Sequence, residues 1–195
     1  MSRRTGYRNP KDHGTHIIVG EGRSEKIYFD RIRSDYSNLL IHTADSKGGD
    51  IDRIKKGVNC EMSSFKKGDS VYVVMDMDTK TAKEIAEFDE WCSKKGVELH
   101  LFNPSFEVFL LMHYDDVSGS LSQEDLEQSI TNHIGRKYDK GRGISLDEAM
   151  ICDAVLRASK ALPEKHSTVK DVALKPGTTT VHKLVKELAD KLRFD

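Results

Sequence analysis

The sequence predicts an α/β fold in which helices cover both faces of a parallel sheet of about four strands, followed by a helical extension. Four short apolar runs typical of strands occur in the first 102 residues, and segments with helical periodicity lie between them. This alternation predicts βαβ crossovers and therefore a parallel sheet. The length of 195 residues suits one domain with an appendage rather than two full domains.

The elements of the first half follow one another in a regular order. The predicted strands cover residues 16–20, 39–43, 70–75 and 97–102. Each run is short and rich in aliphatic side chains, as expected of strands that are buried on both faces. The intervening segments repeat apolar residues every three or four positions, so each is predicted to be a helix that packs on the sheet. These helices are expected at residues 24–36, 50–65 and 79–95.

After residue 102 the pattern changes to helices and loops. Asn103-Pro104 ends the fourth strand, and the apolar segment 106–114 is predicted to form a buried helix. Capping boxes that begin at Ser122 and at Ser145 are predicted to open the next two helices. A glycine-rich basic loop at 135–143 separates these helices, and an amphipathic helix ends the chain. These helices are expected at residues 123–134, 146–161 and 180–193. We therefore predict a flexible basic arm (1–15), a catalytic core (16–115) and a helical extension packed on the core (116–195).

The charge of the chain is unevenly distributed. Lys and Arg total 31 against 32 Asp and Glu, a net charge of −1 that excludes a generic polybasic nucleic-acid binder. Residues 71–120 carry 4 basic and 10 acidic side chains, whereas residues 1–70 carry 14 and 10 and residues 121–195 carry 13 and 12. An acidic run is usually a solvated helix face, so the placement of its carboxylates decides what it indicates.

Three cysteines without CxxC spacing indicate neither a disulfide framework nor a zinc site. The first residues contain no apolar stretch of signal-peptide length, and no run approaches the ~18 apolar residues of a membrane span. We therefore expect a cytoplasmic protein that does not contact a membrane.

Carboxylates follow three of the four predicted strands. Glu21 and Glu25 come after the first strand, Asp76 and Asp78 after the third, and Glu107 after the fourth. Functional groups collect beyond the carboxyl ends of parallel strands, so we expect these side chains to share one edge of the sheet. Such oxygen-rich clusters suit Mg²⁺ or Mn²⁺, and a cation offsets a repulsion of roughly 1–4 kcal/mol between like charges about 4 Å apart. The pattern therefore predicts a divalent-metal site.

Each acidic motif also has a plainer interpretation. Glu21 fits an ordinary turn between a strand and a helix, and Glu25 suits the first turn of a helix. Asp78 suits the cap of the helix that follows it, although an Asp-x-Asp on an extended chain also directs Asp76 and Asp78 to one side. The recurrence of acids at the same edge favours the metal site over these alternatives.

Positive charge for phosphate groups is expected from the flanks of the acidic segment. The candidate contacts are Arg23, Lys47, Lys137, Tyr138, Lys140 and Arg142. In the glycine-rich loop, Tyr138 is available to stack on a base, and the two glycines after Lys47 resemble a small phosphate-contacting loop. The alternatives are solvated surface loops and, for Arg23, an ion pair with a neighbouring acid.

Five stretches of the chain resemble the RloB-like proteins. They are IIVGEGRSEKIYF, VYVVMDMDT, LFNPSFEVFLLMHY, the YDKG loop and GTTTVHKLV. The similarity covers residues 16 to about 185 and is most specific in NPSFEVFLLMHY. It implies a Toprim-type fold related to the nuclease half of OLD-family proteins, a metal-dependent site that cleaves phosphodiester bonds, and a role in phage defence. The resemblance also suggests His182 as a residue that contacts substrate.

By motif, the resemblance assigns Glu21, Asp76 and Asp78 as catalytic residues and principal metal ligands, with Glu25 and Glu107 completing the site. One or two Mg²⁺ or Mn²⁺ ions are expected, because two cations about 3.5–4 Å apart can activate water and stabilise the leaving oxygen. Glu21 is alternatively the general base.

The sequence thus predicts a metal-dependent endonuclease that acts on DNA or RNA, tRNA included. Two alternatives stay open: a regulatory partner of an ATPase that binds metal and nucleic acid without cleavage, and a primase-like nucleotidyl transferase. The sequence contains no Walker-type GxxxxGK[ST], so an ATP-driven step requires a separately encoded ATPase. No oligomeric state is predicted.

Overall fold

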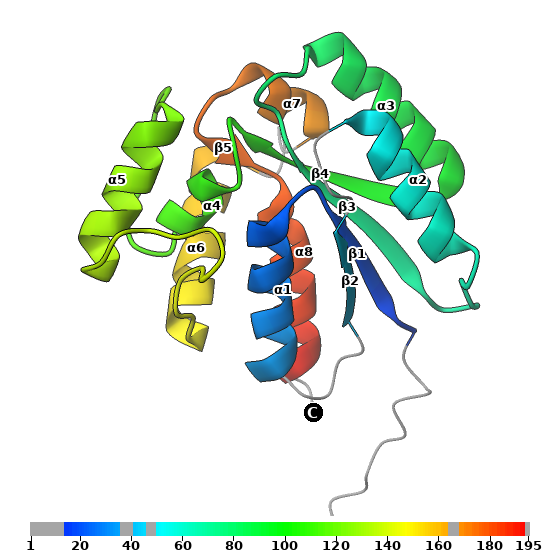
Figure 1. Ribbon diagram of the computed structural model, residues 1–195, viewed down its shortest axis with the longest axis horizontal. Coiled ribbons are helices and arrows are strands. Elements are labelled where there is room, and N and C mark those ends of the chain that lie inside the picture. Colours follow the sequence, from blue (N-terminus) through cyan, green and yellow to red (C-terminus); the bar gives the residue numbers. More distant parts are fainter. Residues whose placement is uncertain (1–13, 36–40, 46–49, 164–167, 194–195) are drawn as a thin grey trace, which may run out of the picture.

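The computed structural model describes residues 14–35, 41–45, 50–163 and 168–193. The predicted α/β fold is confirmed: one sheet has the strand order β2-β1-β3-β4-β5 and carries helices on both faces (Figure 1). The first four strands are parallel, and β5 is antiparallel to β4. The strands are β1 (His16–Gly20), β2 (Ile41–Asp45), β3 (Ser70–Asp76), β4 (Val97–Asn103) and β5 (Thr178–Thr179).

Helices cover the sheet because successive strand residues point to opposite faces. One face, which includes Ile18, Tyr72 and Phe102, packs against α1, α4, α6 and α8, while Val73 and Leu101 face α2, α3 and α7. The helices within the described residues are α1 (Arg23–Asp35), α2 (Ile51–Met62), α3 (Ala82–Lys95), α4 (Glu107–Leu111), α5 (Gln123–Ile134), α6 (Glu148–Ala161), α7 (Val169–Leu174) and α8 (Val181–Arg193). Figure 1 shows α2 and α3 together on one side of the sheet and α1 with α8 on the other.

Side-chain caps fix where several helices begin. The Thr81 side chain accepts a hydrogen bond from the backbone N–H of Glu84, and the Glu84 carboxylate accepts one in return, which forms a capping box at α3. The predicted capping box at Ser122 is confirmed at α5. At α6 the cap is Asp147 rather than the predicted Ser145, because the Asp147 carboxylate accepts from Met150 N–H. This helix therefore starts two residues later than predicted.

Several predicted boundaries differ from the observed ones. β2 is described as Ile41–Asp45 and so continues two residues past the predicted end at 43, because it pairs with β1 up to Gly20; residues 39 and 40 lie outside the described residues. α4 ends at Leu111 rather than at residue 114. β5 and α7 were not predicted: β5 has two residues, too few for a periodic signal, and α7 has six.

The predicted N-terminal arm lies almost entirely outside the described residues. The predicted division at residue 115 stays a prediction. β5, α7 and α8, which follow this position, pair with the sheet or pack on its faces. Within the described part of the chain, no helix combines the length and apolar character needed to cross a membrane.

Candidate functional site

The first two carboxylates lie where β1 joins α1. Glu21 follows β1, and its Oε2 accepts a hydrogen bond of 2.9 Å from the backbone N–H of Asp76. Glu25 lies in the first turn of α1 and is only 3% exposed. The glycines that flank Glu21 leave room for this carboxyl group: a Cβ on Gly22 would lie 3.1 Å from Glu25 Oε2, and one on Gly20 would lie 3.3 Å from Glu25 Cβ. The Gly-Glu-Gly sequence thus allows two acids to approach the end of β3.

Asp76 is the last residue of β3 and joins two parts of the sheet edge. Its Oδ1 accepts a hydrogen bond of 2.7 Å from the backbone N–H of Phe106, which leads into α4. Burial raises the pKa of Asp76 well above its ordinary value, and the negative charges of Glu25, Glu21 and Glu107 raise it further. These acids are therefore close enough to oppose one another's ionisation.

Glu25 is subject to the same combination of forces. Burial, together with the negative charges of Glu21 and Glu107, raises the pKa of Glu25 to about 7, against a hydrogen bond with its own backbone that lowers it. Both shifts favour the protonated form, so ionising this pair of buried acids carries a free-energy cost. A bound cation would remove that cost.

Glu107 opens α4 and is 1% exposed, yet it keeps its charge. Ser105 Oγ donates to its Oε2 at 2.8 Å, Tyr138 Oη donates to its Oε1 at 3.2 Å, and Lys140 Nζ lies 3.1 Å from the same Oε1. Burial opposes the charged form, but the Lys140 ammonium and the hydrogen bonds, among them one with Gln123, hold the pKa of Glu107 below its ordinary value.

Asp78 occupies a different environment from Asp76. Its side chain is 47% exposed and accepts from the backbone N–H of Thr79 and from Thr79 Oγ1. Partial burial opposes ionisation, but these bonds and the Lys80 ammonium hold the pKa of Asp78 below its ordinary value. The extended chain ends at Asp76, so the alternation that would turn both acids the same way does not continue through Met77.

Lys80 connects these groups and was not predicted from the sequence. Its Nζ lies 3.1 Å from Glu21 Oε1 and 3.3 Å from Asp78 Oδ1, and its side chain is only 7% exposed. A lysine two residues after an Asp-x-Asp was the available signal, but an isolated lysine at the start of a helix gives no reason to expect burial. Among the described residues, no group of three or more His, Cys, Asp or Glu side chains is arranged to hold a metal ion.

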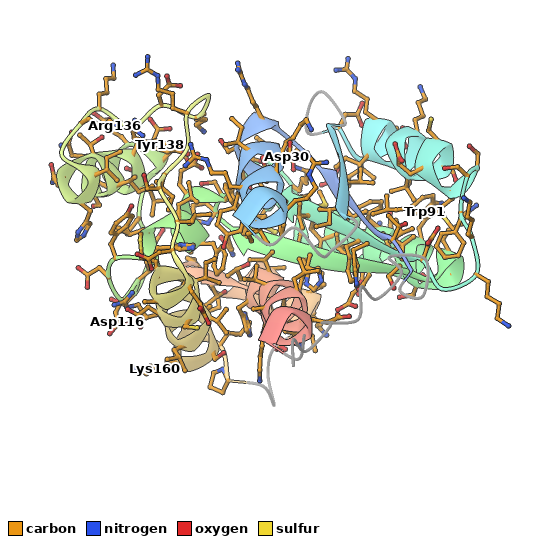
Figure 2. The ribbon with its side chains drawn as sticks, turned by 90° about the horizontal axis from the view of Figure 1, so that it is seen from below. Asp30, Trp91, Asp116, Arg136, Tyr138 and Lys160 are labelled. Atoms are coloured by element: carbon orange, nitrogen blue, oxygen red, sulfur yellow. The ribbon has the colours of Figure 1, made fainter. Side chains whose placement is uncertain are left out.

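Four of the predicted phosphate contacts belong to α1 and the glycine-rich loop. Arg23, Lys137, Lys140 and Arg142 are exposed, and Lys140 reaches both Glu107 and Glu127. Arg23 lies beside the glycine-rich loop, because a Cβ on Gly141 would lie 3.5 Å from Arg23 Cζ. Figure 2 shows Tyr138 in this loop together with Arg136. Lys47 lies outside the described residues.

Two predicted substrate contacts need correction. Tyr138 is 6% exposed and its hydroxyl is bound to Glu107, so its ring packs in the core instead of presenting a face to a base. His182 is 2% exposed, and its Nδ1 donates to the backbone oxygen of Thr179 at 3.0 Å. A burial this complete removes both side chains from the surface that a nucleic acid would contact.

The fold and the site define a class: an α/β protein with buried carboxylates gathered at the carboxyl edge of a parallel sheet, beside a basic loop. The chain belongs to the RloB-like protein family, whose model matches residues 16–188. The predicted family is thereby confirmed. Comparison with curated proteins and with solved structures gives no match.

Proposed function

We propose that this protein is a divalent-metal-dependent nuclease that hydrolyses phosphodiester bonds of nucleic acid and acts in phage defence. The observation that carries the proposal is that Glu21, Glu25, Asp76 and Glu107 converge at one edge of the sheet, where Glu21 binds the Asp76 backbone and both Glu25 and Glu107 are buried. Their negative charges oppose the ionisation of Glu25 and Asp76. Such an arrangement is unfavourable for stability alone, and perturbed carboxyl groups of this kind concentrate at functional sites.

The donor set suits Mg²⁺ or Mn²⁺. All the candidate ligands are carboxylate oxygens, which these hard cations prefer, and Mg²⁺ in phosphoryl-transfer sites is often held by one or two carboxylates together with water and substrate phosphate. A cluster of three side chains is therefore not required. Glu25 and Asp76 would hold the ion, with Glu107 beside them, and the bound ion would supply Lewis-acid stabilisation of the phosphoryl oxygens.

The remaining residues of the site would act on substrate and water. The exposed cations Arg23, Lys137 and Arg142 would bind phosphate groups on either side of the scissile bond. Glu21 would take the proton of the attacking water, as a general base at hydrogen-bond distance from the Asp76 backbone. A separately encoded ATPase remains the proposed partner, and the choice between DNA and RNA is left to experiment.

The test is cleavage of supercoiled plasmid and of tRNA in Mn²⁺. We expect wild type to cleave at least one substrate, and Asp76→Asn and Glu25→Gln to lose activity by at least about 100-fold, the equivalent of roughly 3 kcal/mol of transition-state stabilisation. Glu90→Gln is the matched control, since Glu90 is an exposed acid of α3 that pairs with Lys94.

Equal cleavage by wild type and by the two site variants would contradict the proposal. Retention of labelled nucleic acid without cleavage would support the regulatory alternative, and incorporation of nucleotides into a primer would support the nucleotidyl transferase.

A further inference from the structure

The outer edge of β4 is paired only toward its carboxyl end. β5 pairs with Phe102 and Asn103, and Thr180 binds both the N–H and the C=O of Leu101, so these two groups point away from β3. Because backbone groups alternate in direction along a strand, those of Leu99 also point outward. Within the described residues, neither of these groups of Leu99 is hydrogen-bonded on the outer side. The edge therefore offers an unpaired donor and an unpaired acceptor.

A cavity of about 500 Å³ borders this part of β4. α3 contributes Asp89 and Ser93 to its wall, the N-cap of α7 contributes Thr168, and α8 contributes Lys183. Leu99 lines the cavity but is only 4% exposed, so the edge is recessed between these helices. A single extended chain fits such a recess, whereas the sheet edge of a second copy would be kept away by its own covering helices.

A buried histidine at the same cavity needs a hydrogen-bond donor. His100 is 1% exposed, and its Nδ1 lies 3.2 Å from the backbone oxygen of Thr180, so Nδ1 carries a proton. Burial lowers the pKa of His100 to about 3, which keeps the ring neutral and makes Nε2 an acceptor. Within the described part of the chain Nε2 makes no hydrogen bond, and Glu98 Oε1, another acceptor, lies 3.5 Å away.

The charges at the cavity favour a cationic partner. Asp89 and Glu98 line the cavity, and Glu187 of α8 adds negative charge near Glu98, against the positive charge of Lys183. The Glu98 side chain is 57% exposed and so is accessible from solvent. Since its Oε1 and the His100 Nε2 are 3.5 Å apart, one cationic group can donate to both atoms.

We propose that the edge of β4 binds an extended peptide segment of a partner protein, which adds a strand beside Leu99 and places a lysine or arginine side chain at Glu98. Backbone hydrogen bonds to an added strand provide affinity, and side-chain contacts such as this one provide specificity. The cavity borders residues 96–100, at the amino half of β4, whereas the buried acids lie beyond the carboxyl ends of the strands. This inference therefore does not depend on the proposed nuclease activity.

The test begins with a phage-displayed library of random decapeptides, selected on the immobilised full-length chain. The enriched peptides are then synthesised, and their affinities are measured by fluorescence anisotropy. We expect the enriched peptides to carry a lysine or arginine, and Glu98→Lys to weaken their binding roughly 10-fold through charge reversal. Glu90→Lys is the matched control, because Glu90 is an exposed acid of α3 that pairs with Lys94, and it should leave the affinity unchanged.

Methylation of single backbone nitrogens in an enriched peptide tests the strand pairing without altering the protein. Every second N–H of an added strand faces β4, so methylation should weaken binding at alternate positions only. Failure to enrich any peptide, equal affinity of wild type and Glu98→Lys, or an N-methyl pattern without alternation would overturn the proposal. Dimerisation of wild type that Glu98→Lys abolishes in analytical ultracentrifugation would overturn it as well, because a second copy would then occupy the edge.

Discussion

Buried polar side chains next to the site are held by specific hydrogen bonds, and His113 is the clearest case. Its Nδ1 lies 2.9 Å from the backbone oxygen of Phe109 and its Nε2 lies 3.2 Å from Tyr28 Oη. Since a carbonyl oxygen only accepts, Nδ1 carries a proton. Burial lowers the pKa of His113 and so keeps the ring neutral near pH 7, which leaves Nε2 to accept from the tyrosine hydroxyl. With an exposure of 3%, His113 is a hydrogen-bonded histidine of the core.

The neutral state of His113 has a consequence for stability in acid. Burial lowers the pKa of His113 from 6.5 to about 4. Between these values the unfolded chain binds more protons, so the contribution is complete above pH 6.5 and is lost as the pH falls toward 4. The full shift corresponds to about 3 kcal/mol. We expect urea denaturation to show this loss in wild type, but with a smaller slope in His113→Gln.

His133→Gln is the control for this prediction. His133 is exposed and stacks on Tyr114, so its variant should follow the wild-type pH dependence. Parallel pH profiles for wild type and His113→Gln would show that His113 does not contribute to the acid sensitivity.

Tyr138 is buried and holds a carboxylate of the site in place, instead of lining the surface of the site. Its hydroxyl donates to the buried carboxylate of Glu107. Tyr138→Phe removes that donor, and hydrogen bonds to charged groups contribute about 1.5–3 kcal/mol. We expect a loss of about 1–2 kcal/mol in the free energy of unfolding, because Lys140 and Ser105 remain on Glu107. Tyr114→Phe, measured by the same urea titrations, should change stability by less, and equal losses in both variants would contradict the assigned role.

At the scale of elements, the position of the glycine-rich loop depends on hydrogen bonds from two arginines. No sequence pattern separates these arginines from other surface arginines. Arg31 of α1 donates to the backbone oxygens of Ile144 and Arg142, and Arg136 donates to that of Gly143 at 2.9 Å. These bonds join the loop to α1 and so position Lys140 over Glu107. The loop is therefore an ordered part of the edge.

The hydrogen bonds from Arg31 predict which segment becomes more mobile when they are removed. We expect Arg31→Met to speed amide hydrogen exchange in residues 139–144 several-fold, while exchange in β3 stays slow, because only local contacts are lost. Arg33→Met is the control, since Arg33 pairs with Asp30 on the same helix. Unchanged exchange in the loop of Arg31→Met would show that other contacts hold it.

Most strands and α5 could be predicted from the sequence, whereas β5 could not, and the difference has a physical cause. β1, β3 and β4 were predictable because two buried faces require continuous apolar runs, as in the segment from Val71 to Met75. α5 was predictable from the capping box at Ser122. β5 was not, because its two threonines owe their conformation to pairing with Phe102 and Asn103, which lie far away in the sequence.

The candidate site shows the same division between local and long-range information. The location of the acids at one edge could be predicted from the sequence, because the carboxyl ends of parallel strands share an edge whatever the conformation of the loops. The burial of Lys80, Tyr138 and His182 could not be predicted, because each depends on contacts between separate elements. The predicted roles of the acids stay predictions until metal binding is measured.

At the scale of the whole molecule, the near-zero net charge conceals a separation of charge. The acidic segment 71–120 contains Asp76, Asp78 and Glu107, while exposed cations come from α1 and the glycine-rich loop. The fold places Lys140 on the buried Glu107 and Arg23 beside the glycine-rich loop. A formal charge of −1 is thus compatible with binding a polyanion, because local fields rather than the sum steer a charged partner.

The buried acids are expected to lower the stability of the metal-free protein and to allow metal binding. Both effects can be measured on the full-length chain. Asp76 is disfavoured as an anion by burial and by Glu25, Glu21 and Glu107. Asp76→Asn removes that charge and keeps an oxygen that accepts from the Phe106 N–H. In EDTA at pH 8 we therefore expect Asp76→Asn to be more stable than wild type by about 1–3 kcal/mol in urea denaturation.

Saturating Mn²⁺ should reverse this order. A ligand at 100 times its dissociation constant stabilises the native state by about 2.7 kcal/mol, and this stabilisation requires the Asp76 carboxylate. Wild type should therefore rise above Asp76→Asn. Asp78→Asn, at an exposed acid already paired with Lys80, should be no more stable than wild type in EDTA and should keep the Mn²⁺ response. If Asp76→Asn is the less stable protein in EDTA, or gains as much from Mn²⁺ as wild type, the buried acids serve the fold and not a cation.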